Sequence, residues 1–245
     1  MKLLTTSNLK IMKGQAYGYL TAILHLAPAK LSGFNVCPKA SKGCAAACLN
    51  TAGRGVYSKV QDARIRKTLA FFNDQDAFMA QLVKDVKSVI RKAAKDGLIP
   101  AIRLNGTSDI RWETVKVTEM GKSLLTGEVV SIVWPNIMAL FPNVQFYDYS
   151  KIANRRDLPA NYHLTFSRSE SNAADVAKAL ANGMNVAVVF ATKKGAALPA
   201  TYLNREVIDA DTTDLRFLDK AGVICGLRGK GKARSGSFDN FIVGV

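Results

Sequence analysis

The sequence lacks the long apolar runs and targeting segments that would place a protein in or across a membrane. Its longest apolar stretch, residues 17–29, contains His25 and Pro28 and is shorter than the roughly 20 residues that a spanning helix needs. The first 15 residues contain neither a sustained apolar segment nor a small-residue cleavage site, so we expect no secretory signal. These absences predict a cytoplasmic protein with no membrane partner.

Acidic residues are also scarce, with 19 Asp and Glu against 34 Lys and Arg, so that 34 − 19 gives a net charge of +15. A surplus of this size favours a polyanionic partner, either nucleic acid or a nucleotide. The hydrophobic fraction of 48% and the charged fraction of 22% exclude disorder as the main state. The 245 residues predict a single domain over 1–245.

No internal repeat, low-complexity tract or linker divides the chain, and neither G-x-G-x-x-G nor G-x-x-x-x-G-K-[ST] occurs. The usual dinucleotide and P-loop fingerprints are therefore absent. Short apolar runs alternate with amphipathic segments instead, which is typical of a parallel sheet covered by helices. We predict strands at 17–26, 100–104, 129–133, 144–147, 162–166, 185–190, 206–208 and 222–227, and helices at 56–72, 76–95, 113–125, 135–141 and 172–181. The fold class is α/β, a single complete or partial (βα) barrel.

Cysteine is rare but clustered: of four residues, Cys37, Cys44 and Cys48 form a C-x6-C-x3-C loop after the first predicted strand. In a reducing compartment this clustering favours a metal over disulfides. Three thiolates can hold an iron–sulfur cluster and leave one iron open. Zinc is the alternative, and it needs a fourth ligand. Candidates for that ligand are Cys225, His25, His163 or a carboxylate, although Cys225 in an apolar strand and His25 are more typical of a buried core. Three unliganded thiols are a further alternative.

Polar residues follow most of the predicted strands, and in a (βα) barrel such strand ends form the site. The candidate catalytic residues are two acidic residues, Asp109 and Asp148, and one basic residue, Arg168. Arginine and lysine bind phosphate or carboxylate groups. The candidate cofactor-binding residues are Arg103, Asn105, Lys193, Arg228 and Lys230.

Two further segments carry dense charge. The run 228–234 places four cations on a glycine-rich backbone, a combination suited to gripping phosphate. Asp209, Asp211 and Asp214 form the densest acidic stretch. As a Mg²⁺ site it would fit a metal-dependent nuclease, although a solvated turn is the simpler interpretation.

The loop Cys37-Pro-x-Ala-x3-Cys44-x3-Cys48-Leu49, with the following Gly-Arg-Gly, resembles a bacteriophage three-cysteine family of the gene product eighty-eight type. The resemblance extends to residues 103–109, 146–149 and 165–168 and to the C-terminal basic run. More distantly, the chain resembles the radical S-adenosylmethionine (SAM) enzymes. In those enzymes three cysteines after the first barrel strand bind a [4Fe-4S] cluster and SAM binds the open iron. The cysteine intervals here are longer than the usual C-x3-C-x2-C of that superfamily.

The resemblance implies a [4Fe-4S] cluster on Cys37, Cys44 and Cys48 and an anionic substrate such as nucleic acid or a nucleotide. It also allows SAM as a further ligand of the cluster. It also implies a location in the host cytoplasm. Two other hypotheses stay open at this point: a non-enzymatic nucleic-acid-binding protein with structural zinc, and a nuclease that uses Asp209, Asp211 and Asp214. The sequence alone predicts neither the substrate nor the oligomeric state.

Overall fold

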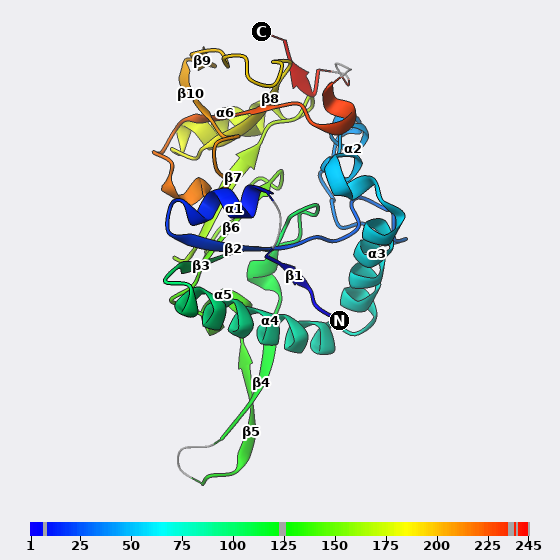
Figure 1. Cartoon of the computed structure of the whole chain (residues 1–245), viewed down its shortest axis with the longest axis vertical. Helices are drawn as coiled ribbons and strands as arrows, with labels where there is room; N and C mark the ends of the chain where they lie inside the picture. Colours follow the sequence, from blue (N-terminus) through cyan, green and yellow to red (C-terminus); the bar gives the residue numbers. More distant parts are fainter. Residues whose placement is uncertain (7–8, 123–125, 235–237, 239, 245) are drawn as a thin grey trace.

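A ten-stranded sheet forms the centre of the fold in the computed structural model (Figure 1), which describes residues 1–6, 9–122, 126–234, 238 and 240–244, without the side chains of 9–11. Its strand order is β1-β2-β3-β6-β7-β8-β11-β10-β9, and β12 pairs with β8. The strands are β1 Leu4–Thr5, β2 Tyr19–Leu24, β3 Ile99–Arg103, β6 Gln145–Ser150, β7 Tyr162–Ser167, β8 Val186–Phe190, β9 Thr201–Tyr202, β10 Arg205–Asp209, β11 Ile224–Arg228 and β12 Ile242–Val243. A separate two-stranded hairpin consists of β4 Val117–Lys122 and β5 Val129–Trp134.

Helices and short 3-10 turns connect these strands. The α-helices are α1 Leu9–Gln15, α2 Lys42–Ala46, α3 Ser58–Asn73, α4 Gln75–Lys95, α5 Ile137–Leu140 and α6 Ala173–Ala181. The 3-10 turns are η1 Leu49–Thr51, η2 Gly53–Val56, η3 Trp112–Thr114, η4 Arg216–Leu218 and η5 Gly231–Arg234. Within the described part of the chain, no helix has both the length and the apolar character required to cross a membrane.

The middle of the sheet is parallel, and its strands follow one another in chain order. β2, β3, β6, β7, β8 and β11 are each paired in parallel with the next. Helices cover one face of these strands, with α3 and α4 packing over β2, β3 and β6, and α6 packing over β7, β8 and β11. Burial on both faces explains why the strands read as continuous apolar runs.

The segment after β10 packs on the other face of the sheet. Phe217 stacks edge-on against Tyr19 of β2 and Tyr147 of β6, with ring centroids 5.1 and 5.4 Å apart. The Nζ of Lys13 in α1 donates a hydrogen bond of 2.8 Å to the carbonyl of Asp211, two residues after β10. A flat sheet would hold β2 and β10, six strands apart, about 29 Å from each other. These contacts therefore draw the two ends of the sheet towards one another.

The predicted α/β alternation is confirmed for most elements, but the helix predicted at 113–125 is wrong. Residues 112–114 form η3, residues 117–122 form β4, and 123–125 lie outside the described residues. β-Branched side chains in Val-Lys-Val-Thr, residues 115–118, favour a strand over a helix. The strand predicted as buried at 129–133 is present, yet it is largely exposed because it lies in the hairpin (Figure 1).

The predicted barrel remains a prediction. Among the described strands the sheet is a path that begins at β1 and ends at β9, and both end strands pair antiparallel with their neighbours. The six parallel strands follow one another in chain order. In a doubly wound sheet, by contrast, the strand order reverses at a switch point.

Candidate metal centre at the cysteine loop

The three loop cysteines occupy three different local structures after β2. Cys37 lies in the irregular loop, Cys44 lies in α2, and Cys48 caps η1. Ser41 caps α2 because its hydroxyl accepts a hydrogen bond of 3.2 Å from the backbone N–H of Cys44. The Cys48 sulfur accepts a weak hydrogen bond from the backbone N–H of Asn50 at 3.5 Å. All three cysteines are half-buried, so their sulfur atoms are set by the folded loop.

The three thiols influence one another electrostatically. Burial above all, with Cys48 and Cys44 nearby, raises the pKa of the Cys37 thiol to about 11. Burial and then Cys44 also raise the pKa of Cys48, whereas Arg64 and Lys151 lower it. Thiols in such surroundings stay protonated unless a cation stabilises the thiolates. A bound metal supplies that stabilisation and releases the protons.

Glu170 anchors this loop to the end of β7. Its carboxylate accepts hydrogen bonds from the Ser41 hydroxyl at 2.6 Å and from the backbone N–H of Gly43 at 2.8 Å. Both donors belong to the segment between Cys37 and Cys44. The hydrogen bonds, and nearby Arg168, hold the pKa of Glu170 below its usual value, although partial burial acts in the opposite direction.

Asp109 anchors the other side of the loop, at the end of β3. Its backbone N–H donates to the carbonyl of Val36 at 2.8 Å, directly before Cys37. Its carboxylate accepts hydrogen bonds from the Ser150 hydroxyl and the Lys151 N–H, both at 2.8 Å. Lys151 is one of the two cations that act on Cys48. Asp109, predicted as an acid–base residue, thus joins Cys37 and Lys151 at the carboxyl ends of the strands.

Arg64 in α3 is a site residue that the sequence analysis missed. It is 8% exposed, and its guanidinium donates to the Asn50 side chain, two residues after Cys48. Its Nε is buried without a hydrogen-bond partner in the described structure. Arg64, Thr68 and Phe71 are the buried residues of α3, spaced i, i+4, i+7 along one face of a helix. An arginine on the same helix face as the apolar Phe71 is the sequence feature that indicates a buried charge here.

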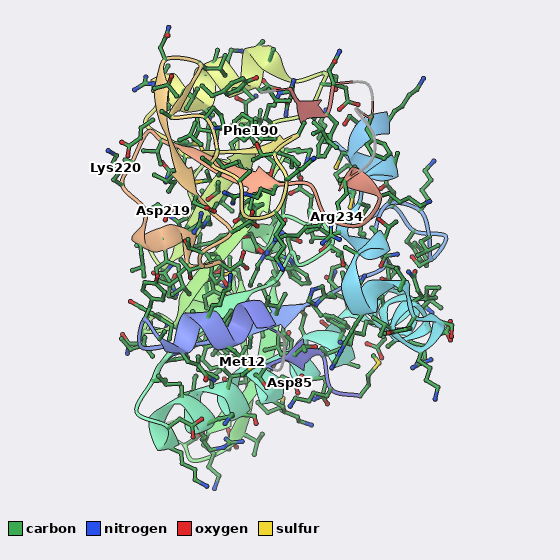
Figure 2. The ribbon with its side chains drawn as sticks, turned by 45° about the horizontal axis from the view of Figure 1, so that its top comes forward. Met12, Asp85, Phe190, Asp219, Lys220 and Arg234 are labelled. Atoms are coloured by element: carbon green, nitrogen blue, oxygen red, sulfur yellow. The ribbon has the colours of Figure 1, made fainter. Side chains whose placement is uncertain are left out.

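The C-terminal basic run lies beside the cysteine loop. η5 ends at Arg234 (Figure 2), and Ala233 shares a buried cluster with Ala47 of the loop. The backbone of Gly231 approaches Thr51 so closely that a Cβ there would lie 2.7 Å from the Thr51 carbonyl. Two of the predicted ligand-binding residues in the run are paired with acids: Arg228 with Asp209 and Asp211, and Lys230 with Asp211.

The other predicted cofactor-binding residues have structural partners. Arg103 is buried and pairs with Asp214 at 2.9 Å. The Asn105 side-chain oxygen accepts hydrogen bonds from Ser108, Ile110 and Trp112, which fixes the turn after β3. Lys193 is exposed in the loop after β8.

The remaining catalytic candidates are also held within the fold. Asp148 is fully buried beneath Asn105, whose backbone N–H donates to it at 2.6 Å. Arg168 donates to the carbonyls of Asn240 and Phe241, so it fastens the C-terminal segment to the end of β7. Asp109 is the catalytic candidate that contacts the cysteine loop directly.

The residues weighed as a fourth zinc ligand have other neighbours. Cys225 is buried and its thiol contacts Asp219 at 3.5 Å. Burial and then Arg64 lower the pKa of His25 to about 3, and burial lowers the pKa of His163. Within the described ranges, no three His, Cys, Asp or Glu side chains surround a position for one metal ion. Asp209, Asp211 and Asp214 form no such group either, because their carboxylates pair with arginines.

A family model described as gene product 88 matches residues 2–240, which include the cysteine loop, its anchors and the basic run. No curated protein and no solved structure matches the chain.

Proposed function

The chain belongs to the gene product 88 family of bacteriophage proteins, and we propose that it is an iron–sulfur protein in which Cys37, Cys44 and Cys48 bind one [4Fe-4S] cluster. The observation that carries this proposal is that three half-buried loop thiols act on one another electrostatically, with two cations, Arg64 and Lys151, acting on Cys48. A cluster held by thiolates is anionic, and these cations suit it.

Zinc is the alternative to a cluster. It draws its sulfur ligands to about 2.3 Å and needs a fourth ligand, and Cys225, weighed for that role, lies beside Asp219. A cluster places each thiolate on a different iron atom and so spreads its ligands more widely. Three protein ligands also leave one iron for an outside molecule, which in a radical-SAM-like protein is SAM.

The remaining parts of the proposal follow from the surroundings of the loop. The six parallel strands in chain order support a partial (βα) barrel of radical-SAM-like type. Glu170 and Asp109 bring the cysteine loop to the carboxyl ends of those strands. The basic run beside the loop supports an anionic substrate, nucleic acid or a nucleotide. When bound, the cluster supplies single electrons to the ligand on its open iron.

The chain itself has three tasks in this proposal. Glu170 and Ser41 hold α2 and therefore Cys44. Asp109 orients the backbone before Cys37 and the backbone of Lys151. Arg64 and Lys151 act against the burial that raises the pKa of Cys48.

The proposal is tested by comparing cysteine variants after anaerobic purification. Wild-type protein should be brown, with visible absorbance from thiolate-to-iron charge transfer. Each of Cys37→Ala, Cys44→Ala and Cys48→Ala should lose most of that absorbance. Cys225→Ala is the matched control, because this thiol lies with Asp219 outside the loop, and it should keep the colour. A Cys44→Ala protein with full metal content would refute the ligand assignment.

A further inference from the structure

The β4–β5 hairpin projects from the body of the molecule as an isolated two-stranded arm (Figure 1). Its strands pair antiparallel in six residue pairs, from Val117 opposite Trp134 to Lys122 opposite Val129. The base is fixed, since Val117 is fully buried and Lys87 of α4 forms an ion pair with Glu119. The rest of the arm has solvent on both faces.

One face of the arm carries three exposed apolar side chains beside Thr118, Ser131 and Lys122. Met120, Val129 and Val133 are exposed by 67%, 63% and 60%. Met120 lies opposite Ser131. Val129 and Val133, each two residues from Ser131, are therefore diagonal neighbours of Met120 on the same face. The three side chains therefore form one continuous patch that is not part of the protein core.

The outer edge of β5 is open as well. Among the described strands, β5 pairs with β4 alone, so its other side presents unpaired backbone N–H and C=O groups. Val129–Trp134 contains no charged residue and no proline. Natural proteins protect exposed edges with charges, prolines or bulges. β5 has neither charges nor prolines, although the whole chain carries a charge of +15.

We propose that a second copy of this chain pairs its β5 with this edge, so that two arms form one four-stranded antiparallel sheet across a two-fold axis. An antiparallel strand is complementary to its own copy, which is the requirement for a closed symmetric dimer. A lone hairpin is marginally stable, whereas three or more strands with an apolar face are stable. A nucleic-acid partner would require cations, and β5 has none.

Charge favours the same occupant. Two copies with a net charge of +15 each repel one another over most of their surface. The uncharged β5 edge lies on an arm that extends away from the body (Figure 1), so pairing there brings few like charges together. This dimer is independent of the proposed metal centre.

Sedimentation over a range of protein concentrations tests the proposal. The wild-type chain should shift from one to two copies as concentration rises. Val133→Lys and Ser131→Lys place like charges across the two-fold axis and should weaken the dimer at least tenfold. Ser131 is an exposed polar residue, so its lysine variant keeps the fold even if Val133→Lys does not.

Met12→Lys is the control for added positive charge. Met12 is 61% exposed on α1 (Figure 2), so its variant should dimerise like the wild type. A chain that stays monomeric at every concentration overturns the proposal. A dimer that Ser131→Lys leaves unchanged, or that Met12→Lys weakens equally, also overturns it.

Discussion

The Ser41 hydroxyl donates a hydrogen bond of 2.6 Å to the carboxylate of Glu170, across 129 residues of sequence. The same carboxylate accepts the backbone N–H of Gly43, and Ser41 in turn accepts the N–H of Cys44. The loop that carries the cysteines is thus fixed to the carboxyl end of β7. Its geometry is a property of the whole sheet and not of the loop alone.

Removing this carboxylate should loosen the cysteine loop. Glu170→Ala deletes the acceptor for two hydrogen bonds and should lower the free energy of unfolding by about 1 kcal/mol, because the group is only partly buried. Glu170→Gln keeps one oxygen acceptor and should lose less. Asp62→Asn, an exposed carboxylate on α3, is the control and should have no effect. Urea unfolding measures all three, and equal stability of Glu170→Ala and wild type would argue against the anchor.

Gly43 should tolerate no side chain. A Cβ at this position would overlap the carbonyl of Phe238 and lie 2.6 Å from the Cβ of Phe241. Gly43→Ala should therefore separate α2 from the C-terminal segment and cost about 1–3 kcal/mol, as overpacked positions do. Gly244→Ala has nothing within 4 Å and should be neutral. Thermal melting compares the two variants, and similar melting temperatures would contradict the packing described for α2.

Stability should depend on pH through Asp148. Burial raises the pKa of this carboxyl to about 7, while Arg103 and hydrogen bonds from Asn105 and Tyr162 act in the opposite direction. In the unfolded chain an aspartate has a pKa of about 4. Between about pH 4 and 7 the folded state therefore holds a proton that the unfolded state has lost.

Stability should accordingly fall as pH rises through this window, by at most about 1.4 kcal/mol per pH unit. Asp148→Asn should remove this part of the dependence. Urea midpoints at several pH values from 4 to 8 measure it. An Asp148→Asn protein with the same pH slope as wild type would show that the carboxyl does not titrate there.

The buried ion pair between Arg103 and Asp214 should be costly to break on one side. Asp214→Asn leaves the guanidinium buried without its charged partner and should lower stability by about 3–5 kcal/mol. The double variant Arg103→Met, Asp214→Leu removes both charges and should lose less stability than the single variants Arg103→Met and Asp214→Leu combined. A double-mutant cycle by urea unfolding measures the difference, and strict additivity would mean that the pair is not coupled.

Local signals in the sequence predict the helices and parallel strands well. The helix predicted at 76–95 is α4, and its residues Phe78, Leu82, Val86 and Val89 are buried at helical spacing. Asp74 caps its start, and Gly97 follows its end with a φ of +65°. Here the apolar period, the cap and the glycine agree, so each supports the same structure.

The hairpin shows where that reasoning fails. The apolar residues 129–133 predict a buried strand because core strands have this composition. Strand preference comes from β-branched side chains, however, and it holds whether or not the strand is covered. Gly127, with a φ of +72°, lies between β4 and β5.

The site is likewise predictable only in part. The spacing of Cys37, Cys44 and Cys48 identifies the loop, whereas the position of the basic run beside it follows from the fold. The partners Glu170 and Arg64 depend on which strands and helices adjoin the loop, and Arg103 lies 111 residues from Asp214. Only the folded topology determines such pairs.

Iron, inorganic sulfide and zinc measured together in one anaerobically purified sample test the central claim most directly. The proposal predicts about four irons and four sulfides per chain, with zinc far below one. One zinc per chain without iron, or a chain with no metal after reconstitution with iron and sulfide, would contradict it.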